Sequence, residues 1–444
     1  MSATMRRRRL GSCLPMACVA LGWLLPTVGQ AQGLTAFDRD RTQIMLDRVR
    51  KEIADRYYDP GFNGIDLQAA YDSASARIRS STTLARALAA VAQFTLDLHD
   101  PHTFFIPPQW TVDVTYGWDM AMVGDSCFVL DVAPGSDAER KGLLRGDLVL
   151  SVNGLTPTRD NVWQIFYVYR AVRPQPGLNT VVRSPGALPR RLDLLAAVRE
   201  RRRIIGLTDL GGDIAQLIRD AEKADEELKS VVMEYGDRVL IWKLPTFAIS
   251  NQDIQDVVKR ARSREALVLD LRGNSGGPVQ SLIALVGGLN RDSVVLGMQR
   301  ERHKQTALIA KGTGAKAFTG RLLVLVDSRS GSASEVVARV VQLTQRGHVL
   351  GDRTAGAVRR STFRRLRQGV EIAVFYGVSV TDADLVMTDG GRLERAGVNP
   401  DELIIPTASD LAAGADPVLA RALALAGEPL GAAEAGSLLR RERR

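Results

Sequence analysis

Cysteine and histidine are both scarce in this sequence. Its 444 residues include three cysteines and four histidines. The longest apolar stretch, roughly Leu14–Leu25, is shorter than the ~20 residues that a membrane-spanning helix requires. Hydrophobic residues make up 45% of the chain and charged residues 25%, as in ordinary globular proteins. These features exclude a disulfide-rich scaffold, a multi-span membrane protein and an intrinsically disordered chain.

The first residues predict a secretory signal peptide. Arg6–Arg9 form a positive region, Leu14–Leu25 form an apolar one, and Gly29–Ala31 places small residues where signal peptidase requires them. We therefore expect residues 1–31 to be removed by cleavage after Ala31. The mature protein would then be exported to a bacterial periplasm, with no integral membrane span. The alternative, a retained membrane anchor, is disfavoured by the shortness of the apolar stretch.

Cleavage would change the composition of the chain. The mature protein keeps only Cys127, so no intrachain disulfide can form and stability must come from a packed core. The formal charge falls from +9 to +5, because the signal carries four arginines and no acid. The remaining basic clusters, Arg359–Arg367 and Arg440–Arg444, contain few aromatic residues. They indicate solvated surface and not a nucleic-acid site.

Changes in hydrophobic periodicity divide the mature chain into regions. Apolar residues recur at helical spacing in the first region, and short strands with an Asn153–Gly154 turn follow. A highly charged stretch then leads to alternating strands and helices, which are typical of a mostly parallel sheet. We predict a helical region at 32–111, a β-rich module at 112–198, a linker helix at 199–235 with its helix at Ile214–Met233, an α/β layer at 236–408, and a C-terminal helix with a basic tail at 409–444.

One serine lies where a predicted strand gives way to a helix. The apolar strand Leu322–Val326 leads through a short turn to Ser332, where the helix begins. A helix N-terminus offers free N–H groups and a partial positive charge to a developing oxyanion, so Ser332 is a candidate nucleophile. Ser332 and Glu335 also have the spacing of a capping box. On spacing alone, a helix cap is the commoner explanation.

Two further segments carry residues suited to catalysis. The buried strand Ala266–Leu271 ends in the loop Arg272–Gly277, whose three glycines allow backbone N–H groups to approach a ligand closely. No Gly-Lys-Ser/Thr follows, so this is not a phosphate-binding loop. The segment Asp97–Pro108 contains two of the four histidines, His99 and His102. A metal site there has poor support, because no third cluster of ligands accompanies them.

Together these segments resemble the C-terminal-processing (tail-specific) protease family. The resemblance implies an α+β multidomain fold with a helical N-terminal region, a PDZ-like peptide-binding module at 112–198 and a crotonase/ClpP-like α/β catalytic core. It places the nucleophile at Ser332 and not at Ser334. The matching stretches are, in chain order, Lys141–Asp147, Val152–Gly154, Val268–Gly277, Ser330–Glu335 and Gly351–Ala357.

The catalytic base departs from the bacterial pattern of this family. That branch uses a Ser–Lys dyad, but its lysine falls on Ala357 here, and no lysine follows Lys316. The tricorn-like branch instead carries a histidine in a D-x-H-T context and a glutamate before G-V-x-P-D, which Asp100–Thr103 and Glu394–Asp401 match. In tricorn a serine precedes the histidine. Pro101 stands there in this chain, and a proline cannot relay a hydrogen bond.

The resemblance implies an acyl-enzyme mechanism with neither a metal nor an organic cofactor. Ser332 would attack the scissile carbonyl, and His102 would serve as base and then as acid. Glu394 would orient the site or balance its charge. Backbone N–H groups of Gly276 and Ala333 would form the oxyanion hole.

The resemblance also implies polypeptide substrates, bound through their C-termini by the PDZ-like module. Tyr116, Gly117 and Trp118 are the candidate loop for the terminal carboxylate. The alternative function is that of a pseudo-enzyme, a secreted PDZ-bearing adaptor whose hydrolase fold has lost its base. Ala357 and Pro101 favour that alternative, whereas the presence of Ser332 and the tricorn-like motifs counts against it.

Overall fold

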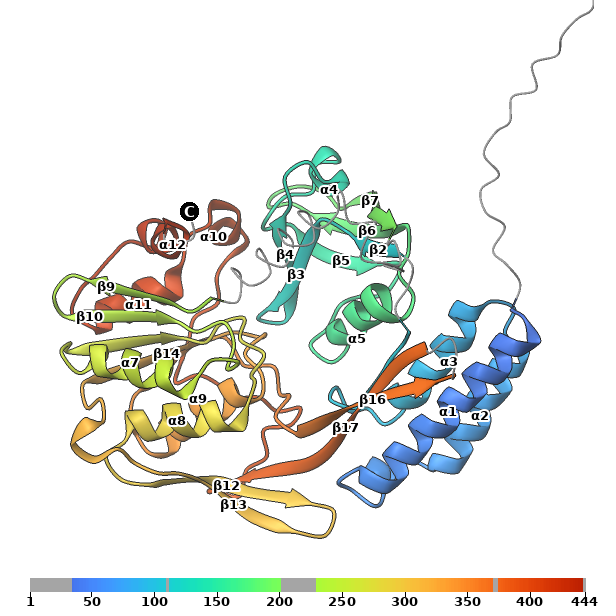
Figure 1. Cartoon of the computed structure of the whole chain (residues 1–444). Coiled ribbons are helices and arrows are strands. Elements are labelled where there is room, and N and C mark those ends of the chain that lie inside the picture. The colour runs from blue at the N-terminus through green and yellow to red at the C-terminus, as the bar shows by residue number, and fades with distance from the viewer. Residues whose placement is uncertain (1–33, 109–111, 201–228, 370–373, 442–444) are drawn as a thin grey trace, which may run out of the picture.

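The structure, a computed structural model of the chain, describes residues 34–108, 112–200, 229–369 and 374–441 (Figure 1). The signal peptide expected at residues 1–31 lies outside these ranges. Within them, no helix has both the length and the apolar character needed to cross a membrane.

Three helices form the N-terminal region, as the sequence predicts. Each begins at a residue whose side chain accepts a backbone N–H of the first turn, namely Thr35, Asp66 and Thr83. Their buried faces pack together and against one face of a long strand, where Tyr376 and Val378 join the same core. The bounds are α1 (Ala36–Arg56), α2 (Leu67–Ser80) and α3 (Leu84–Leu96), with a 3₁₀ turn η1 (Phe62–Gly64).

The second region is a β-rich module, and its chain turns back at Asn153 and Gly154 as predicted. Both residues have positive φ, +48° and +82°, which is typical of an Asn-Gly hairpin turn. Five antiparallel strands form one sheet in chain order, so that β3 is an edge strand. The elements are β2 (Val112–Thr115), β3 (Trp118–Val123), β4 (Ser126–Val132), α4 (Asp137–Arg140), β5 (Leu148–Val152), α5 (Val162–Tyr167), η2 (Val168–Val172), β6 (Gly177–Arg183), β7 (Arg190–Leu195) and β8 (Ala197–Glu200).

The third region is an α/β layer around a six-stranded sheet. Its central strands are buried on both faces, which explains their continuous apolar runs. Alternate residues face α7, α8 and α9 on one side and α11 on the other (Figure 1). The strand order is β18 (Glu402–Leu403), β15 (His348–Gly351), β14 (Arg321–Val326), β11 (Ala266–Asp270), β10 (Val239–Lys243) and β9 (Val231–Tyr235), all parallel except β9. The helices are α7 (Asn251–Ala261), α8 (Val279–Leu289), α9 (Ala333–Leu343), α10 (Ala408–Ala413), α11 (Pro417–Leu425) and α12 (Ala432–Arg441).

A second, five-stranded sheet joins the α/β layer to the N-terminal helices. Its longest strand, β17, pairs with β16 and β1 near one end and with β12 at the other. In Figure 1 the β16–β17 ribbon crosses the middle of the molecule, from the β12–β13 hairpin toward the N-terminal helices. The bounds are β1 (Phe104–Ile106), β12 (Val294–Glu301), β13 (Gln305–Ala310), β16 (Arg360–Gln368) and β17 (Val374–Met387), with a 3₁₀ turn η3 (Gly314–Lys316).

Buried ionic contacts attach the β-rich module to the α/β layer. The guanidinium of Arg159 donates to both carboxylate oxygens of Asp352, at 2.8 and 2.7 Å. Asp352 also accepts the N–H of Gly124, in the turn after β3, at 2.9 Å. Both bonds come from Nη2 of the guanidinium and are charge-assisted, so the module is held against the loop that follows β15.

Two predicted boundaries are wrong. The linker helix was expected to reach Met233, but residues 231–235 form strand β9, which pairs antiparallel with β10. The β-branched residues Val231 and Val232 suit a pleated strand beside Trp242 better than a helix; most of the remaining linker lies outside the described residues. The expected single C-terminal helix is three short helices, and α11 packs into the core of the sheet.

Candidate active site

Ser332 lies in the turn between β14 and α9. Its backbone has φ +53° and ψ −117°, a conformation that costs an L-residue on the order of 1–3 kcal/mol. The N–H of Ser332 donates to the carbonyl of Ala357 at 2.7 Å and to Oε2 of Glu335 at 3.0 Å. These two bonds hold the strained turn, and the Ser332 side chain lines a cavity.

Glu335 is a buried carboxylate that ties the serine turn to the following loop. Besides the N–H of Ser332, it accepts the Thr354 hydroxyl at 2.6 Å and the N–H groups of Gly356 and Ala357 at 2.7 and 2.8 Å. Burial raises the pKa of Glu335 to about 7, against the effect of its hydrogen bonds. Glu335 therefore contributes to a helix cap, as its spacing suggests, and also positions the candidate nucleophile. The sequence alone indicated only the cap.

The glycine loop lies directly against Ser332. Gly276 has φ +105°, and a Cβ at this position would lie 2.5 Å from the Cβ of Ser332 and 3.1 Å from the nitrogen of Ala333. The N–H of Gly276 already donates to Oδ1 of Asn274 at 2.8 Å. Its expected oxyanion role therefore requires Asn274 to release it. In the described chain the N–H groups of Ala333 and Gly277 have no acceptor, and both residues line the cavity.

His102 is held by the residues that surround it in its motif. Asp100, fully buried, accepts the backbone N–H of His102 at 2.9 Å and the hydroxyl of Tyr57 at 2.9 Å. Thr103 is also buried, and its hydroxyl bonds with Thr381 of β17 at 3.0 Å. These anchors fix the loop before β1, and the His102 ring lines the same cavity as Ser332.

Glu394 approaches His102 directly. Its Oε2 lies 3.9 Å from Nε2 of His102 and accepts the N–H groups of Val358 and Arg359 at 2.9 and 3.2 Å. Its Oε1 and the Nε2 of His102 are both buried without a hydrogen-bond partner among the described residues. Catalytic hydrogen bonds are often long before substrate binds. Since no side chain needs to bridge the two residues, Pro101 does not obstruct their interaction.

The cavity has a volume of about 260 Å³ and an apolar wall beside the serine. No lysine lines it within the described residues. Ala357 occupies the position of the family lysine, and Lys316 is exposed. Lys243 is largely buried, but it donates to Asp270 at 3.1 Å and to a backbone carbonyl. The described structure therefore provides His102 as the candidate base, and it holds no group of three metal-ligating side chains.

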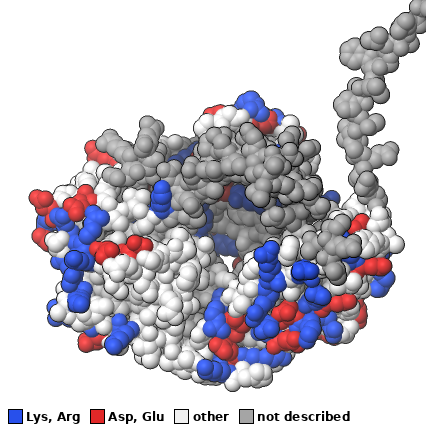
Figure 2. Space-filling model, in the orientation of Figure 1, with Lys and Arg blue, Asp and Glu red and all other residues white. Residues whose placement is uncertain are grey.

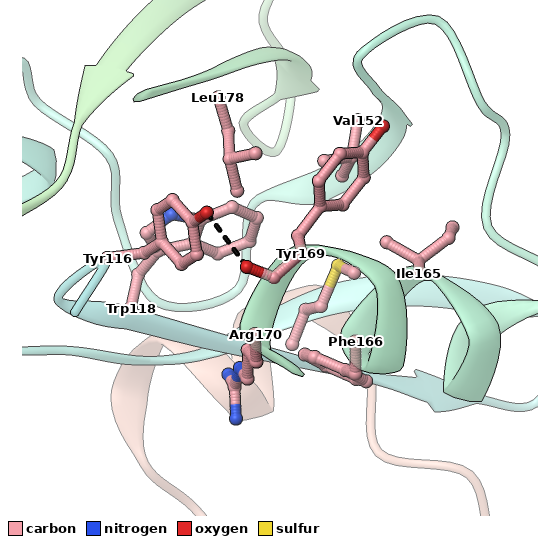
Figure 3. A pocket seen from close by; sticks show the side chains of 9 residues that line it. Tyr116, Trp118, Val152, Ile165, Phe166, Tyr169, Arg170 and Leu178 are labelled. Atoms are coloured by element: carbon pink, nitrogen blue, oxygen red, sulfur yellow. Dashed lines mark hydrogen bonds between the residues drawn. The ribbon is translucent and has the colours of Figure 1, made fainter. Parts of the chain in front are cut away.

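The candidate carboxylate loop lies at the start of the edge strand β3. The Tyr116 hydroxyl donates to the carbonyl of Tyr169 at 3.0 Å, and the side chains of both residues line a small pocket between β3 and the helix formed by α5 and η2 (Figure 3). Gly117 has φ +72°. The pocket is otherwise lined by Trp118, Met120, Val152, Ile165, Phe166, Arg170 and Leu178.

Comparisons with known proteins match the part of the chain that holds most of the candidate site. The family model Peptidase family S41 matches residues 238–404, which include Ser332 and Glu394. The chain is 23% identical to the tail-specific protease of Haemophilus influenzae over 68% of this chain and 43% of that protein. It is 25% identical to the chloroplastic C-terminal processing peptidase of Tetradesmus obliquus over 82% of this chain and 77% of that protein. The chain thus spans less than half the length of the Haemophilus relative.

A solved structure supports the fold. The structure of mature CPAF has a TM-score of 0.64 with 14% identity, covering 85% of this chain and 95% of that one. The sequence comparisons thus show a likeness to the S41 family and to proteins named tail-specific or C-terminal-processing peptidases.

Proposed function

We propose that this chain, given its S41 likeness, is an exported serine endopeptidase that cleaves polypeptides near C-termini bound by its PDZ-like module. Ser332 is the nucleophile, His102 the general base and Glu394 its carboxylate partner. One observation carries the proposal: Ser332 and His102 line a single cavity, and Oε2 of Glu394 lies 3.9 Å from Nε2 of His102. A cluster of a strained serine, a half-buried histidine and a buried carboxylate is typical of an active site.

The mechanism follows from the order of these groups. Oγ of Ser332 bonds to the scissile carbonyl carbon while His102 takes its proton. The oxyanion accepts the free N–H of Ala333 and one from the glycine loop, either Gly277 or Gly276 after release from Asn274. The C–N bond then breaks, and His102 returns the proton to the leaving amine. Water, activated by His102, hydrolyses the acyl-enzyme and restores Ser332.

Glu394 stabilises the protonated histidine in this scheme. When His102 accepts the serine proton, its ring becomes a cation beside a buried carboxylate whose Oε1 is unpartnered. A shift of about 1 Å would bring the pair to the 2.7–2.9 Å of a charge-assisted hydrogen bond. The interaction therefore strengthens as charge develops, which is the condition for lowering the barrier and not merely for binding substrate.

The groove of the β-rich module supports peptide binding. β3 is an edge strand that a peptide could extend by backbone hydrogen bonds, as PDZ domains do. The adjoining pocket, lined by apolar side chains such as Trp118, Ile165 and Phe166, suits an apolar residue near a substrate C-terminus.

Labelling with a fluorophosphonate probe tests the catalytic assignment. We expect the wild-type chain to be labelled at Ser332 and the Ser332→Ala variant not to be labelled. His102→Ala should slow labelling about 10²–10⁴-fold, the usual contribution of a general base. Lys316→Ala, at an exposed site, should label at the wild-type rate.

Two outcomes would reject the assignment. Silence of a folded wild-type chain toward both probe and peptides would favour the adaptor alternative. Normal labelling of His102→Ala together with loss in Lys316→Ala would show that a lysine supplies the base. Thermal unfolding of each variant separates loss of chemistry from loss of fold.

A further inference from the structure

The β16–β17 ribbon begins at the catalytic cavity. Arg360 and Ser361, the first residues of β16, line the cavity together with Ser332. β16 pairs with β17 along its length and has no strand partner on its second edge within the described chain. An unpaired edge presents N–H and C=O groups that an extended chain can bind. At the far end the Arg48 side chain of α1 donates to the carbonyl of Arg367 at 3.1 Å.

The ribbon carries positive charge that the rest of the described structure does not neutralise. Arg364, Arg365 and Arg367 make no ion pair within the described residues, whereas Arg360 pairs with acids at 3.1 and 2.7 Å. In Figure 2, blue side chains gather where the ribbon runs in Figure 1, at the margin of the central hollow. An extended chain beside β16 would therefore lie in a positive field.

Two exposed aromatic rings accompany these arginines. Phe363 is 54% exposed and Phe375 is 47% exposed. The guanidinium carbon of Arg365 lies 4.3 Å from the centre of the Phe375 ring, a cation–π contact. Phe363, Arg365 and Arg367 follow at every second position, so they share one face of the strand.

Edge strands often carry charge simply to prevent aggregation. That explanation accounts for the arginines but not for the two exposed rings or for the position of the ribbon. Two large exposed rings on the same ribbon would favour the association that the charges are meant to prevent. The ribbon also starts in the wall of the candidate active site. The combination fits a binding surface better than a protected edge.

We propose that the free edge of β16 binds an extended segment of the substrate as an added strand, and that Arg365 and Arg367 select segments with acidic side chains at alternate positions. The inference rests on the proposed peptidase function, because it names the substrates of that site. Substrate side chains two residues apart would face the same side as the two arginines. Because Arg360 and Ser361 begin the strand at the cavity, the bound segment would lead the scissile bond toward Ser332.

To test this binding role of β16, peptide binding and peptide hydrolysis are measured separately. Three fluorescent peptides share one sequence and an amidated C-terminus, and carry two Glu, two Gln or two Lys residues at alternate positions. Their affinity for the inactive Ser332→Ala chain is measured by fluorescence anisotropy. We expect the Glu peptide to bind about tenfold more tightly than the Lys peptide, since each cross-strand charge pair contributes modestly, and the difference to shrink at high salt. N-methylation of alternate backbone amides should weaken all three peptides.

Variants distinguish the ribbon from general surface charge. In the Ser332→Ala background, R365E/R367E should reverse the Glu-over-Lys preference, and F363A should weaken all three peptides alike. R262E, at an exposed residue after α7, should leave the preference unchanged. Equal binding of the Glu and Lys peptides, or a preference that survives R365E/R367E, would overturn the inference. Hydrolysis of the peptides by the wild-type chain independently tests the proposed function, so the two failures are distinguishable.

Discussion

Replacing Gly276 with alanine should damage the active site more than the fold. The added Cβ would lie 2.5 Å from the Cβ of Ser332 and 3.0 Å from its Oγ. Ordinary carbon contacts require about 3.5–4.0 Å, so the loop or the serine must move by about 1 Å. A displacement of that size at reacting atoms can reduce the rate about 10²-fold. We therefore expect Gly276→Ala to slow fluorophosphonate labelling by about that factor.

Gly273 provides a matched control in the same loop. It also has positive φ, +74°, but a Cβ there would meet only the guanidinium of Arg329, at an ordinary 3.5 Å. Both alanine variants should lose on the order of 1–3 kcal/mol of unfolding free energy from backbone strain. Only Gly276→Ala should also slow fluorophosphonate labelling. If the two variants unfold alike and label at equal rates, the argument that Gly276 positions Ser332 is wrong.

Two further predictions concern pH and specificity. Burial raises the pKa of Glu335 from 4.5 to about 7, so the folded state holds this proton more tightly than the unfolded state. The free energy of unfolding should therefore fall as the pH rises from about 4.5 to 7, by at most ~1.4 kcal/mol per pH unit. Urea unfolding should show this decline relative to Glu335→Gln, whereas a difference that grows with pH would mean that the four hydrogen bonds outweigh burial. If the β-rich module binds a free carboxylate, amidating a peptide's C-terminus should weaken its binding about 10- to 100-fold, because a charge-assisted contact of about 1.5–3 kcal/mol is lost. Equal affinity, measured by calorimetry, would reject carboxylate binding there.

The α/β layer was predictable because its central strands are buried on both faces. Leu267 and Leu269 face one core while Val268 faces the other, so the strand is apolar at every position. The glycines and the apolar run therefore locate strand, loop and helix within a residue or two. The helix caps at Asp66 and Thr83 are local in the same sense, because capping depends on neighbouring residues.

The β16–β17 ribbon was not predictable in this way. Its basic strand contains Arg364, Arg365 and Arg367, and its apolar residues are too few to give a clear alternation. The sequence indicated solvated surface at Arg359–Arg367, and Arg365 and Arg367 are exposed. For Arg359 the prediction is wrong, because its side chain is 11% exposed and lies near Asp100 and Asp384. The position of these arginines in a strand depends on pairing with β17. Local propensity is weak evidence for strands whose stability comes from a partner elsewhere in the chain.

The candidate active-site residues likewise divide into those that the local sequence indicates and those that distant contacts bring together. The strand-to-helix turn located Ser332 from local pattern, but the pairing of His102 with Glu394 depends on distant contacts. Thr103 attaches the histidine loop to β17, and Glu394 follows that strand and is held by the N–H groups of Val358 and Arg359, just before β16. The ribbon thus brings the two residues together across the chain.

Ala357, which stands where the resemblance places the family's lysine, bears on the choice of catalytic base. Ala357 is tied to Glu335, whose carboxylate accepts the Ala357 N–H at 2.8 Å, and it carries no amine that could compete with His102 for the serine proton. The cavity of Ser332 is lined instead by His102, Arg359 and Arg360 among its charged or titratable side chains, and burial favours the neutral form of the Glu335 carboxylate behind the serine turn. A histidine base suits such a site, because it is neutral before it accepts the proton and gains charge only beside Glu394. The missing lysine and the direct approach of Glu394 to His102 are therefore consistent parts of the catalytic arrangement that we propose.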